Sequence, residues 1–334
     1  MRFTARRKGI AAAVVTVAIW TGFIVIGRAS AGLTLLPFDI ALLRVLGAGA
    51  VLLPWGWVLA RRAAAAGQAT SLLGFSPLPP GQTALTGLFG GLVYAVLAYA
   101  GFFFAPAAHA SVLMPGSLPL WTTLLAAALL AERITPARAL GLACIVAGDL
   151  LVGGASLLGA FSGGEVWKGD VIFMAAAFCW SVYSVLARRY GLDPVRATIA
   201  ITAFACFTYV PAFALAVGAG GLPTRLAQAP WGEIAFQALF QGVGSVVVSG
   251  IAFVQMVRAF GPVRSTMLTA LVPGLSALAA VLLLGEPLGW NLLAGLALVT
   301  AGILFGVRGA TQKRAASACR TGAGGQKDTE RLAA

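Results

Sequence analysis

The chain has 334 residues, is 60% hydrophobic and 10% charged, and carries a formal net charge of +13. Soluble domains are about 45–50% apolar and about 25% charged, so this composition excludes an ordinary soluble fold and indicates apolar side chains that face lipid. The basic residues lie in short segments without interleaved aromatic residues, which excludes a nucleic-acid surface and is typical of the cytoplasmic loops of a membrane protein.

Apolar runs follow one another along the chain, and a helix needs about 20 apolar residues to cross a hydrocarbon core of about 30 Å. In the first half, after a basic head at residues 1–8, they lie at residues 10–27, 39–60, 82–104, 107–130 and 136–153. Residues 61–80 are rich in Ala, Gly, Ser and Pro and predict a long, mobile loop. A Gly/Ser-rich stretch at residues 155–166 predicts a linker between two halves.

The second half contains five further apolar runs, at residues 168–187, 195–217, 231–257, 263–284 and 288–307. Residues 309–334 are polar and basic, and we expect a disordered cytoplasmic tail there. The sequence therefore predicts an all-α integral membrane protein with ten transmembrane helices. These helices form two five-helix repeats, at residues 9–154 and 167–308.

One segment occurs twice, because adding 154 to residues 111–150 gives a similar segment at residues 265–304 without a gap. Its identical pairs include Pro119/Pro273, Glu132/Glu286, Gly141/Gly295 and Gly148/Gly302. Near the start of each half, an offset of 160 pairs Trp20 with Trp180 and Arg28 with Arg188. A first helix with such a twin is part of the fold, which argues against a cleaved signal peptide. The two glutamates each follow an apolar run, so we expect them to act as caps.

The basic residues predict the orientation of the helices, because cytoplasmic loops of membrane proteins are enriched in Lys and Arg. With the N-terminus in the cytoplasm and ten helices, the 23 Lys and Arg residues all fall in cytoplasmic segments except Arg28, Arg44, Lys168 and Arg225. Both termini are then cytoplasmic. Since the repeated unit has an odd number of helices, the second unit is inverted relative to the first. Inverted repeats are typical of secondary transporters, whose substrate site lies in a central cavity near the midplane.

The apolar run at residues 231–257 carries the most polar side chains. At 100° per residue, five of them share one helical arc of about 120°. They are Gln237, Gln241, Ser245, Ser249 and Gln255. Polar side chains within a membrane face a cavity or a partner helix. We therefore predict Gln241, Ser245 and Gln255 as substrate-binding residues, with interhelical hydrogen bonding as the alternative.

Several aromatic residues lie within the apolar runs and not at their ends, where interfacial anchors occur. They are Trp20, Tyr94, Tyr99, Trp121, Trp180 and Tyr183. Trp180 and Tyr183 share one helix face because they are three residues apart. Aromatic rings stack on apolar or aromatic solutes, so we predict that these residues line the cavity. Packing in the protein core is the alternative for each of them.

Three ionisable residues and two prolines complete the predicted machinery. His109, Asp149 and Arg44 lie within apolar runs, and ionisable residues at that depth are candidates for a proton or charge site. A structural polar role is the alternative for His109. Pro119 and Pro273 are twins within predicted helices, where proline removes a backbone hydrogen bond. We predict a pair of hinges at these positions, with a static kink as the alternative.

Sequence patterns of catalysis and cofactor binding are missing. The sequence has no Walker motif, no HExxH, no glycine-rich phosphate loop and no cluster of His, Cys, Asp and Glu. The cysteines have no spacing that suits a metal site or a disulfide framework; they are Cys144, Cys179, Cys206 and Cys319. We therefore expect no enzyme activity, no catalytic residue, no metal and no cofactor. The scarcity of interior carboxylates fits a facilitative transporter better than an ion-coupled one.

The duplicated pattern resembles the EamA-type members of the drug/metabolite transporter superfamily. The resemblance rests on the repeated Pro, Glu and Gly residues, on Trp20 and Trp180, and on Arg44 in the second helix. It implies a ten-helix exporter that works by alternating access in a bacterial inner membrane. The length and the Ala-rich composition are closest to exporters of aromatic and neutral amino acids. The resemblance therefore implies an amino acid or a similar metabolite as substrate, and a monomer in the lipid bilayer.

Two alternatives to facilitative amino-acid export stay open in the sequence. A proton-coupled multidrug or metabolite exporter needs a titratable group, for which Asp149 and His109 are available. A non-transporting membrane scaffold would tolerate substitution of Gln241 or Trp180. Phosphorylated sugars are disfavoured as substrates, because they need several Arg or Lys in the pore and only Arg44 is present.

Overall fold

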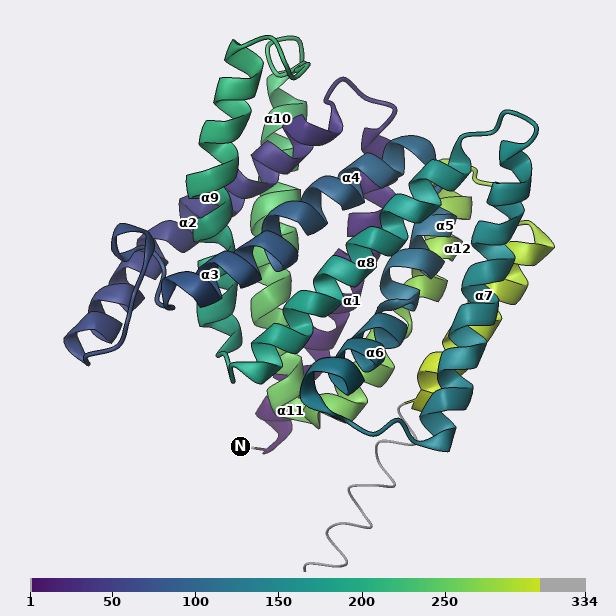
Figure 1. Ribbon diagram of the computed structural model, residues 1–334, viewed down its shortest axis with the longest axis horizontal. Coiled ribbons are helices and arrows are strands. Elements are labelled where there is room, and N and C mark those ends of the chain that lie inside the picture. Colours follow the sequence, from purple (N-terminus) through teal and green to yellow (C-terminus); the bar gives the residue numbers. More distant parts are fainter. Residues whose placement is uncertain (1, 307–334) are drawn as a thin grey trace, which may run out of the picture.

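The computed structural model describes residues 2–306, apart from the side chains at positions 2–6, 262–264 and 266. Within this part of the chain the regular structure is helical (Figure 1), apart from an isolated β-bridge between Ser71 and Ser76. Nine helices in residues 2–306 are long and apolar enough to cross a membrane, and a shorter apolar helix, Trp290–Gly306, follows them. The predicted all-helical membrane fold is confirmed. The predicted tail at residues 309–334 lies outside the described residues.

The first half of the chain forms four unbroken or nearly unbroken spans after the first helix. Its elements are α1 (Arg2–Ser30), α2 (Pro37–Ala65), η1 (Leu72–Gly74), α3 (Pro80–Gly87), η2 (Leu88–Val93), α4 (Tyr94–Phe104), α5 (Ala107–Ser111), η3 (Val112–Gly116), α6 (Leu118–Leu130) and α7 (Pro136–Ala160). Here η1 is a 3₁₀ turn, whereas η2 and η3 are π-helical. Together α3, η2 and α4 make one span, and α5, η3 and α6 make another, Ala107–Leu130. The helices α2, α3 and α7 each begin with a proline in the first turn. Proline lacks the backbone N–H, but the N–H groups of the first turn have no hydrogen-bond partner within the helix, so nothing is lost there.

The second half repeats this order with a longer π-helical stretch. Its elements are α8 (Val166–Arg189), α9 (Pro194–Gly218), α10 (Trp231–Gln237), η4 (Ala238–Val248), α11 (Ser249–Thr269), α12 (Val272–Leu284) and Trp290–Gly306. The π-helix η4 joins α10 and α11 into a single span, Trp231–Gly261. Because a π-helix has wider turns than an α-helix, η4 changes which side chains share a face of this span.

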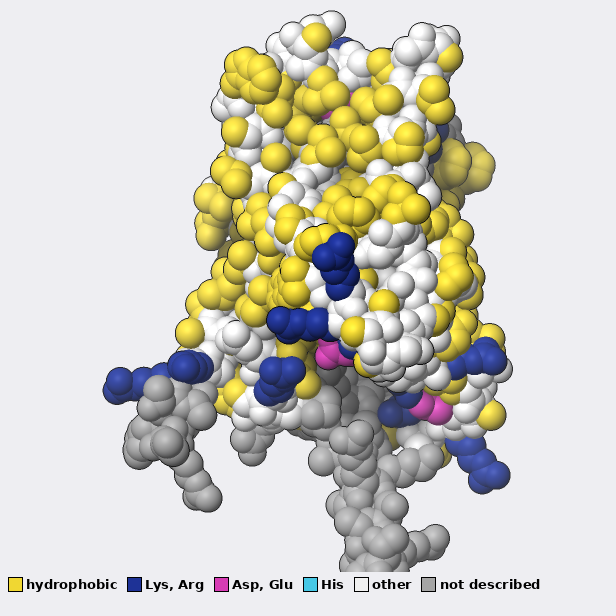
Figure 2. Space-filling model, turned by 90° about the vertical axis from the view of Figure 1, so that its left-hand side faces the viewer, with side chains coloured by type: hydrophobic (Ala, Val, Ile, Leu, Met, Phe, Trp, Pro, Cys, Tyr) yellow, Lys and Arg dark blue, Asp and Glu magenta, His cyan; other side chains and the backbone are white. Residues whose placement is uncertain are grey.

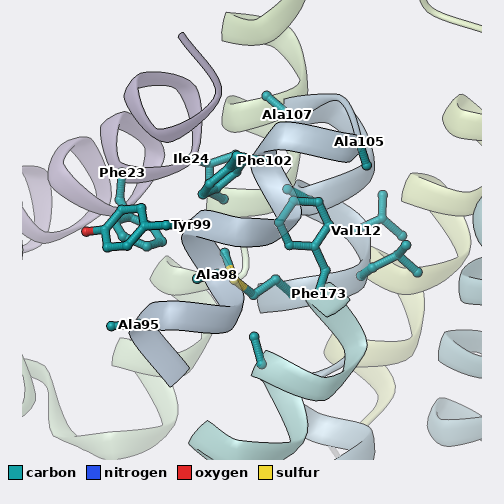
Figure 3. Packing of buried hydrophobic residues seen from close by; sticks show 14 of the residues in the cluster. Phe23, Ile24, Ala95, Ala98, Tyr99, Phe102, Ala105, Ala107, Val112 and Phe173 are labelled. Carbon is teal, nitrogen blue, oxygen red and sulfur yellow. The ribbon is translucent and has the colours of Figure 1, made fainter. Parts of the chain in front are cut away.

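Helices from the two halves lie side by side. α1 packs against α11 and α12, α2 packs against η4 and α9, and α4 runs beside α8 across the middle of the bundle (Figure 1). A buried core joins α1, α4 and α8 through Phe23, Phe102 and Phe173 (Figure 3). The ring centroids of Phe102 and Phe173 are 5.1 Å apart in an edge-to-face arrangement, which aromatic pairs favour. The halves therefore share one core.

The outer surface is apolar, as lipid requires. Large hydrophobic side chains are exposed on nearly every span, among them Leu150, Leu215, Leu282 and Leu283. On the face drawn in Figure 2, hydrophobic side chains cover most of the surface, and Lys and Arg gather towards one end. This distribution matches a bilayer around the middle of the bundle and a basic loop region at one of its ends.

The paired glycines of the repeated segment contact each other across the two halves, and the first glycine of one copy contacts the second glycine of the other. A Cβ placed on Gly141 would lie 2.6 Å from the carbonyl oxygen of Gly302, and one on Gly148 would lie 2.6 Å from that of Gly295. Only glycine permits such a close approach between two helix backbones. Since Gly141 is the twin of Gly295 and Gly148 is the twin of Gly302, α7 and Trp290–Gly306 run antiparallel across a local two-fold relation.

Two loop predictions need correction. The linker predicted at residues 155–166 is helical up to Ala160, because α7 runs on through Gly153 and Gly154 and its end is fixed by a hydrogen bond from Ser156 to Asp170 of α8. The loop predicted at residues 61–80 is shorter, since α2 continues to Ala65. It is also bound to α3: the Oγ atoms of Ser71 and Ser76 lie 2.9 Å and 2.7 Å from the Oγ1 of Thr83.

The positions of the prolines also differ from the prediction. Pro119 and Pro273 do not kink a continuous α-helix; each occupies the first turn of a new one, α6 and α12. The break predicted between the runs at residues 231–257 and 263–284 is present but short: Gly261, with φ 78° and ψ 164°, interrupts the helix inside α11, and the spans on either side are Trp231–Gly261 and Met267–Leu284. Glycine has no Cβ to oppose a positive φ, so a one-residue break suffices there.

Candidate functional site

Arg44, in the second turn of α2, is held by neutral acceptors from two other helices. Its Nη1 donates hydrogen bonds to the Oγ of Ser245 at 3.1 Å, to the carbonyl oxygen of Gln241 at 3.3 Å and to the hydroxyl of Tyr99 at 3.4 Å. The guanidinium carbon also lies 5.5 Å from the ring centroid of Phe23 in α1. A cation–π contact of this kind favours the charged group without neutralising it.

The other edge of the Arg44 guanidinium is free. Among the described residues, neither Nε nor Nη2 has a hydrogen-bond partner, and no carboxylate forms an ion pair with Arg44. The side chain is half-buried at a depth where a charge without a counter-ion is unfavourable. The free edge of a guanidinium binds a carboxylate through two parallel N–H···O bonds. The geometry therefore suits an anionic group of a ligand.

Close helix contact positions this arginine. A Cβ on Gly47 of α2 would lie 2.1 Å from the carbonyl oxygen of Ala238, and one on Gly242 of η4 would lie 2.7 Å from the Cα of Gly47. The two glycines let the backbones of α2 and η4 touch one turn beyond Arg44. The same contact brings Gln241 and Ser245 within reach of the guanidinium. π-helical segments such as η4 are rare and are frequent at functional sites.

Tyr99 and Gln241 lie buried beside Arg44. The Tyr99 hydroxyl donates to the Oε1 of Gln241 at 3.0 Å, and both side chains are buried. The Nε2 of Gln241 is also buried and has no hydrogen-bond partner among the described residues. A buried amide donor without an acceptor is costly, so this group adds a second unused polar function to the free edge of Arg44.

An aromatic cluster formed by Tyr94, Trp180 and Tyr183 lies further along α4 from the Tyr99 that contacts Arg44. The ring centroids of Tyr94 and Trp180 are 4.8 Å apart, and those of Trp180 and Tyr183 are 5.2 Å apart. Gly90 makes room for it, since a Cβ there would lie 2.5 Å from the Tyr183 ring. Tyr94 and Tyr99 are both in α4, about 7.5 Å apart along the helix axis. α4 therefore connects the aromatic cluster to the arginine site.

The remaining predicted residues occupy other places. Trp20 stacks on Phe253 of α11 with ring centroids 5.5 Å apart, and Trp121 packs edge-to-face on Phe178 at 5.4 Å. Gln255 is exposed on α11 and is separate from the Arg44 cluster, because η4 changes the helical phase between them.

The predicted proton sites divide into a paired and an unpaired group. The Nδ1 of His109 lies 3.0 Å from the Oδ1 of Asp170. Asp149 is buried, and its two carboxylate oxygens have no hydrogen-bond partner among the described residues. In the same part of the chain, no group of three or more His, Cys, Asp and Glu side chains is placed to hold a metal ion.

Three residues of these sites were missed in the sequence. Phe23 and Phe253 are ordinary aromatic residues of apolar runs, and nothing in their spacing marks them as partners of Arg44 and Trp20. Asp170 was overlooked although it is one of few acidic residues inside an apolar run. The scarcity of intramembrane carboxylates could have identified it by the same reasoning that identified Asp149.

Comparisons with known proteins bear on the family and the fold of the chain. The model of the EamA-like transporter family matches residues 7–154 and 167–308. The chain is 26% identical over 230 residues to the "Uncharacterized transporter YyaM" of Bacillus subtilis (strain 168), an alignment that covers 66% of this chain and 70% of that protein. A solved structure described as "Crystal structure of protein" has a TM-score of 0.55 and 24% identity, over 91% of this chain and 97% of its own, which shows a shared fold.

Proposed function

We propose, from the premise that this chain belongs to the EamA-like transporter family, that its substrates are small carboxylates with an apolar or aromatic side chain. As a member of that family it is a multi-pass membrane transporter. Aromatic and neutral amino acids are the substrates that fit best. The proposed direction is export from the cytoplasm, by alternating access.

The observation that carries this proposal is the free edge of Arg44. A substrate carboxylate would bind Nε and Nη2 of the guanidinium and would supply the counter-ion that the described residues do not provide. The apolar part of the same molecule would pack against the rings of Tyr94, Trp180 and Tyr183. A phosphorylated sugar fits less well, because Arg44 is the one cation that the described residues bring to this site and the phosphate group is doubly charged.

The proposed topology has ten helices, two inverted repeats and both termini in the cytoplasm of a bacterial cell, where the chain acts as a monomer in the inner membrane. The antiparallel contact of the glycine twins supports the inversion, and the gathering of Lys and Arg at one end supports the orientation. In this proposal the helix breaks before Pro119 and Pro273 are paired hinges, at which the halves move to expose the site to either side.

A transport assay with the full-length chain tests the substrate class. Liposomes that contain the purified protein are loaded with one labelled compound, and its efflux is compared with that from empty liposomes. Phenylalanine, tryptophan, leucine and threonine form the test panel, and phenylethylamine is the matched compound without a carboxylate. We expect phenylalanine to leave faster than from empty liposomes, and phenylethylamine to leave no faster than from empty liposomes. Efflux equal to that of empty liposomes across the panel would refute the proposal.

Substitution of Arg44 tests the site itself. In Arg44→Gln, loss of a charge-assisted bidentate contact of about 2–3 kcal/mol predicts at least a tenfold rise in the KM for phenylalanine. Arg44→Lys keeps the charge but loses the planar fork, so we expect an intermediate KM. Arg62→Gln, at an exposed position near the end of α2, is the matched control and should behave as the unsubstituted chain. A normal KM in Arg44→Gln would exclude Arg44 as the carboxylate site.

A further inference from the structure

Asp149 is a buried acid without a counter-ion. It lies in the middle of α7, its exposed fraction is 7%, and neither carboxylate oxygen accepts a hydrogen bond from any described residue. Burial removes water from a carboxylic acid, and without a hydrogen-bond donor in its place the charged form is strongly disfavoured. Among the described residues no hydrogen bond or ion pair involves Asp149, and it is not part of the Arg44 site.

The elements packed against α7 bring no cation to Asp149. α6, η3 and the helix Trp290–Gly306 contain no titratable side chain. α8 carries Lys168, Asp170, Cys179, Tyr183, Arg188 and Arg189. Of these, Lys168 pairs with Glu165 and Arg188 pairs with Glu132, both near the ends of α8. On α7 itself, Arg138 lies three turns away from Asp149 and pairs with Glu132.

A separate polar cluster lies further along α7. Ser156 lies seven residues after Asp149 on the same face of α7, about 10 Å along the helix axis. Its hydroxyl donates to the Oδ2 of Asp170 in α8, and Asp170 is also bound by the Nδ1 of His109 in α5 at 3.0–3.1 Å. The cluster therefore places a second carboxylate, Asp170, and the imidazole of His109 on the side of α7 that carries Asp149.

A close backbone contact and a helix break lie near this acid. Asp149 directly follows Gly148, whose backbone touches Gly295 in the twin helix. The neighbouring π-helical turn η3 ends at the break before α6, at Gly116 and Ser117. A shift at either place would change the surroundings of Asp149. The energy of its charged form would therefore differ between two arrangements of the halves.

We propose that Asp149 is a proton-binding site that couples a proton gradient to transport. In one arrangement the acid holds its proton. In the other its O–H bond breaks, the proton passes to water, and the electron pair stays on the carboxylate oxygen. This inference rests on the proposed transport function, and it assigns the coupling ion that the proposed function leaves open.

Carbodiimide labelling tests the site without any substrate. The hydrophobic reagent dicyclohexylcarbodiimide reacts with protonated carboxylic acids in membranes, and peptide mass spectrometry locates the adduct. With the full-length chain in liposomes we expect labelling of Asp149 at pH 6 that decreases as the pH rises. Asp149→Asn should abolish it and Asp149→Glu should retain it. Glu165 is exposed and serves as the internal control that stays unlabelled. Absence of an adduct at Asp149, or suppression of the adduct by sodium at constant pH, would overturn the assignment of a proton site.

Transport measurements separate this inference from the proposed function. In the unsubstituted chain, an imposed pH gradient should raise accumulation of labelled phenylalanine at least tenfold over that without a gradient. Asp149→Asn should lose this increase and keep exchange of labelled for unlabelled phenylalanine within about threefold of normal. Exchange without any response to the gradient in the unsubstituted chain would refute coupling and leave the substrate assignment intact. Labelling of Asp149 without exchange would instead support the site and refute the proposed substrate.

Discussion

Glu286 and Glu132 are twins in the sequence repeat, yet they are bound in different ways at the two ends of one membrane span, Ala107–Leu130. Glu286 lies at the start of the span and accepts hydrogen bonds from the backbone N–H groups of Ala107 at 2.8 Å and of Ala108 at 2.9 Å. Glu132 lies just past the end of the span and is bound by the side chains of Arg188 and Arg138. The exposed fraction of the side chain is 11% for Glu286 and 36% for Glu132.

The arginine partners of these glutamates are also twins. Arg28 of the first half contacts Glu286 of the second half, with Nε 3.6 Å from Oε1, and Arg188 of the second half contacts Glu132 of the first. The two ion pairs therefore join the halves at opposite ends of the bundle, Arg28–Glu286 at one end and Arg188–Glu132 at the other. Both glutamates follow a residue with a left-handed backbone, Ala131 or Gly285, which ends the preceding helix in the same way.

The difference arises from the residues that each glutamate meets. The offset of 154 pairs Ala107 and Ala108 with Gly261 and Pro262. Proline has no N–H, so the second hydrogen bond of Glu286 has no equivalent at the Glu132 end. One end is therefore fastened through the main chain and the other through exposed side chains. The halves are related by sequence, but the strength of their two connections is not equal.

The largest effect should come from Glu286→Gln. The substitution leaves at least one N–H of α5 without an acceptor and leaves Arg28 without its carboxylate, so we expect a loss of about 3 kcal/mol in the free energy of unfolding. Thermal unfolding in detergent, followed by tryptophan fluorescence, measures it. Glu165→Gln, at an exposed carboxylate, is the control and should change the stability by less than about 0.5 kcal/mol. Equal melting temperatures for the two variants would contradict the capping role.

Arg28→Gln should have an intermediate effect. It removes the contact with Glu286 and a hydrogen bond of 2.7 Å from Nη1 to the carbonyl oxygen of Phe102, but leaves the two backbone N–H bonds in place. The Arg28 side chain is 35% exposed, which weakens the ion pair, so we expect a loss of about 1–2 kcal/mol. The same unfolding assay measures it, with Arg7→Gln at an exposed position of α1 as the control. A loss larger than that of Glu286→Gln would mean that the arginine, and not the cap, fastens this end.

The smallest effect should come from Glu132→Gln. Exposed ion pairs contribute at most about 1 kcal/mol and are screened by salt. We expect a double-mutant cycle between Glu132→Gln and Arg188→Gln to give a coupling energy below about 1 kcal/mol at low salt, and nearly none in 1 M NaCl. A coupling energy above about 2 kcal/mol that persists in high salt would show that the two ends are equally strong after all.

Much of the fold follows from local properties of the chain. The apolar runs predict the membrane helices because each residue there has to be compatible with lipid, whatever its neighbours are. The span at residues 107–130 was placed with both ends at the observed residues. Boundaries failed where an end is fixed from outside the segment. α7 extends past its two glycines to Ala160 because Ser156 binds Asp170 of the next helix, and no periodicity within residues 136–166 contains that information.

The candidate site divides in the same way. The sequence identified eight of the site residues, because polar, charged or aromatic residues are conspicuous in an apolar helix. They are Arg44, Tyr99, Gln241, Ser245, Tyr94, Trp180, Tyr183 and Asp149. Spacing placed Trp180 with Tyr183 and Gln241 with Ser245 on shared helix faces, but it did not show which other helices these faces meet. The π-helical stretch η4 alters the phase between Gln241 and Gln255, so a calculation at 100° per residue assigns them to one face although Gln255 is exposed and separate from the site.

By itself, the sequence determined that this protein is a helical membrane protein with an internal duplication. It also identified the side chains that are too polar to face lipid. The tertiary structure decided which of them meet. It brings the backbone of η4 onto α2 and, among the described residues, leaves one edge of Arg44 and the carboxylate of Asp149 without a partner. It also distinguishes Glu286 from Glu132, which no comparison of the two glutamates alone reveals. The physical reason is that solubility in lipid is a property of each segment, whereas a hydrogen bond or an ion pair depends on two segments that the fold brings together.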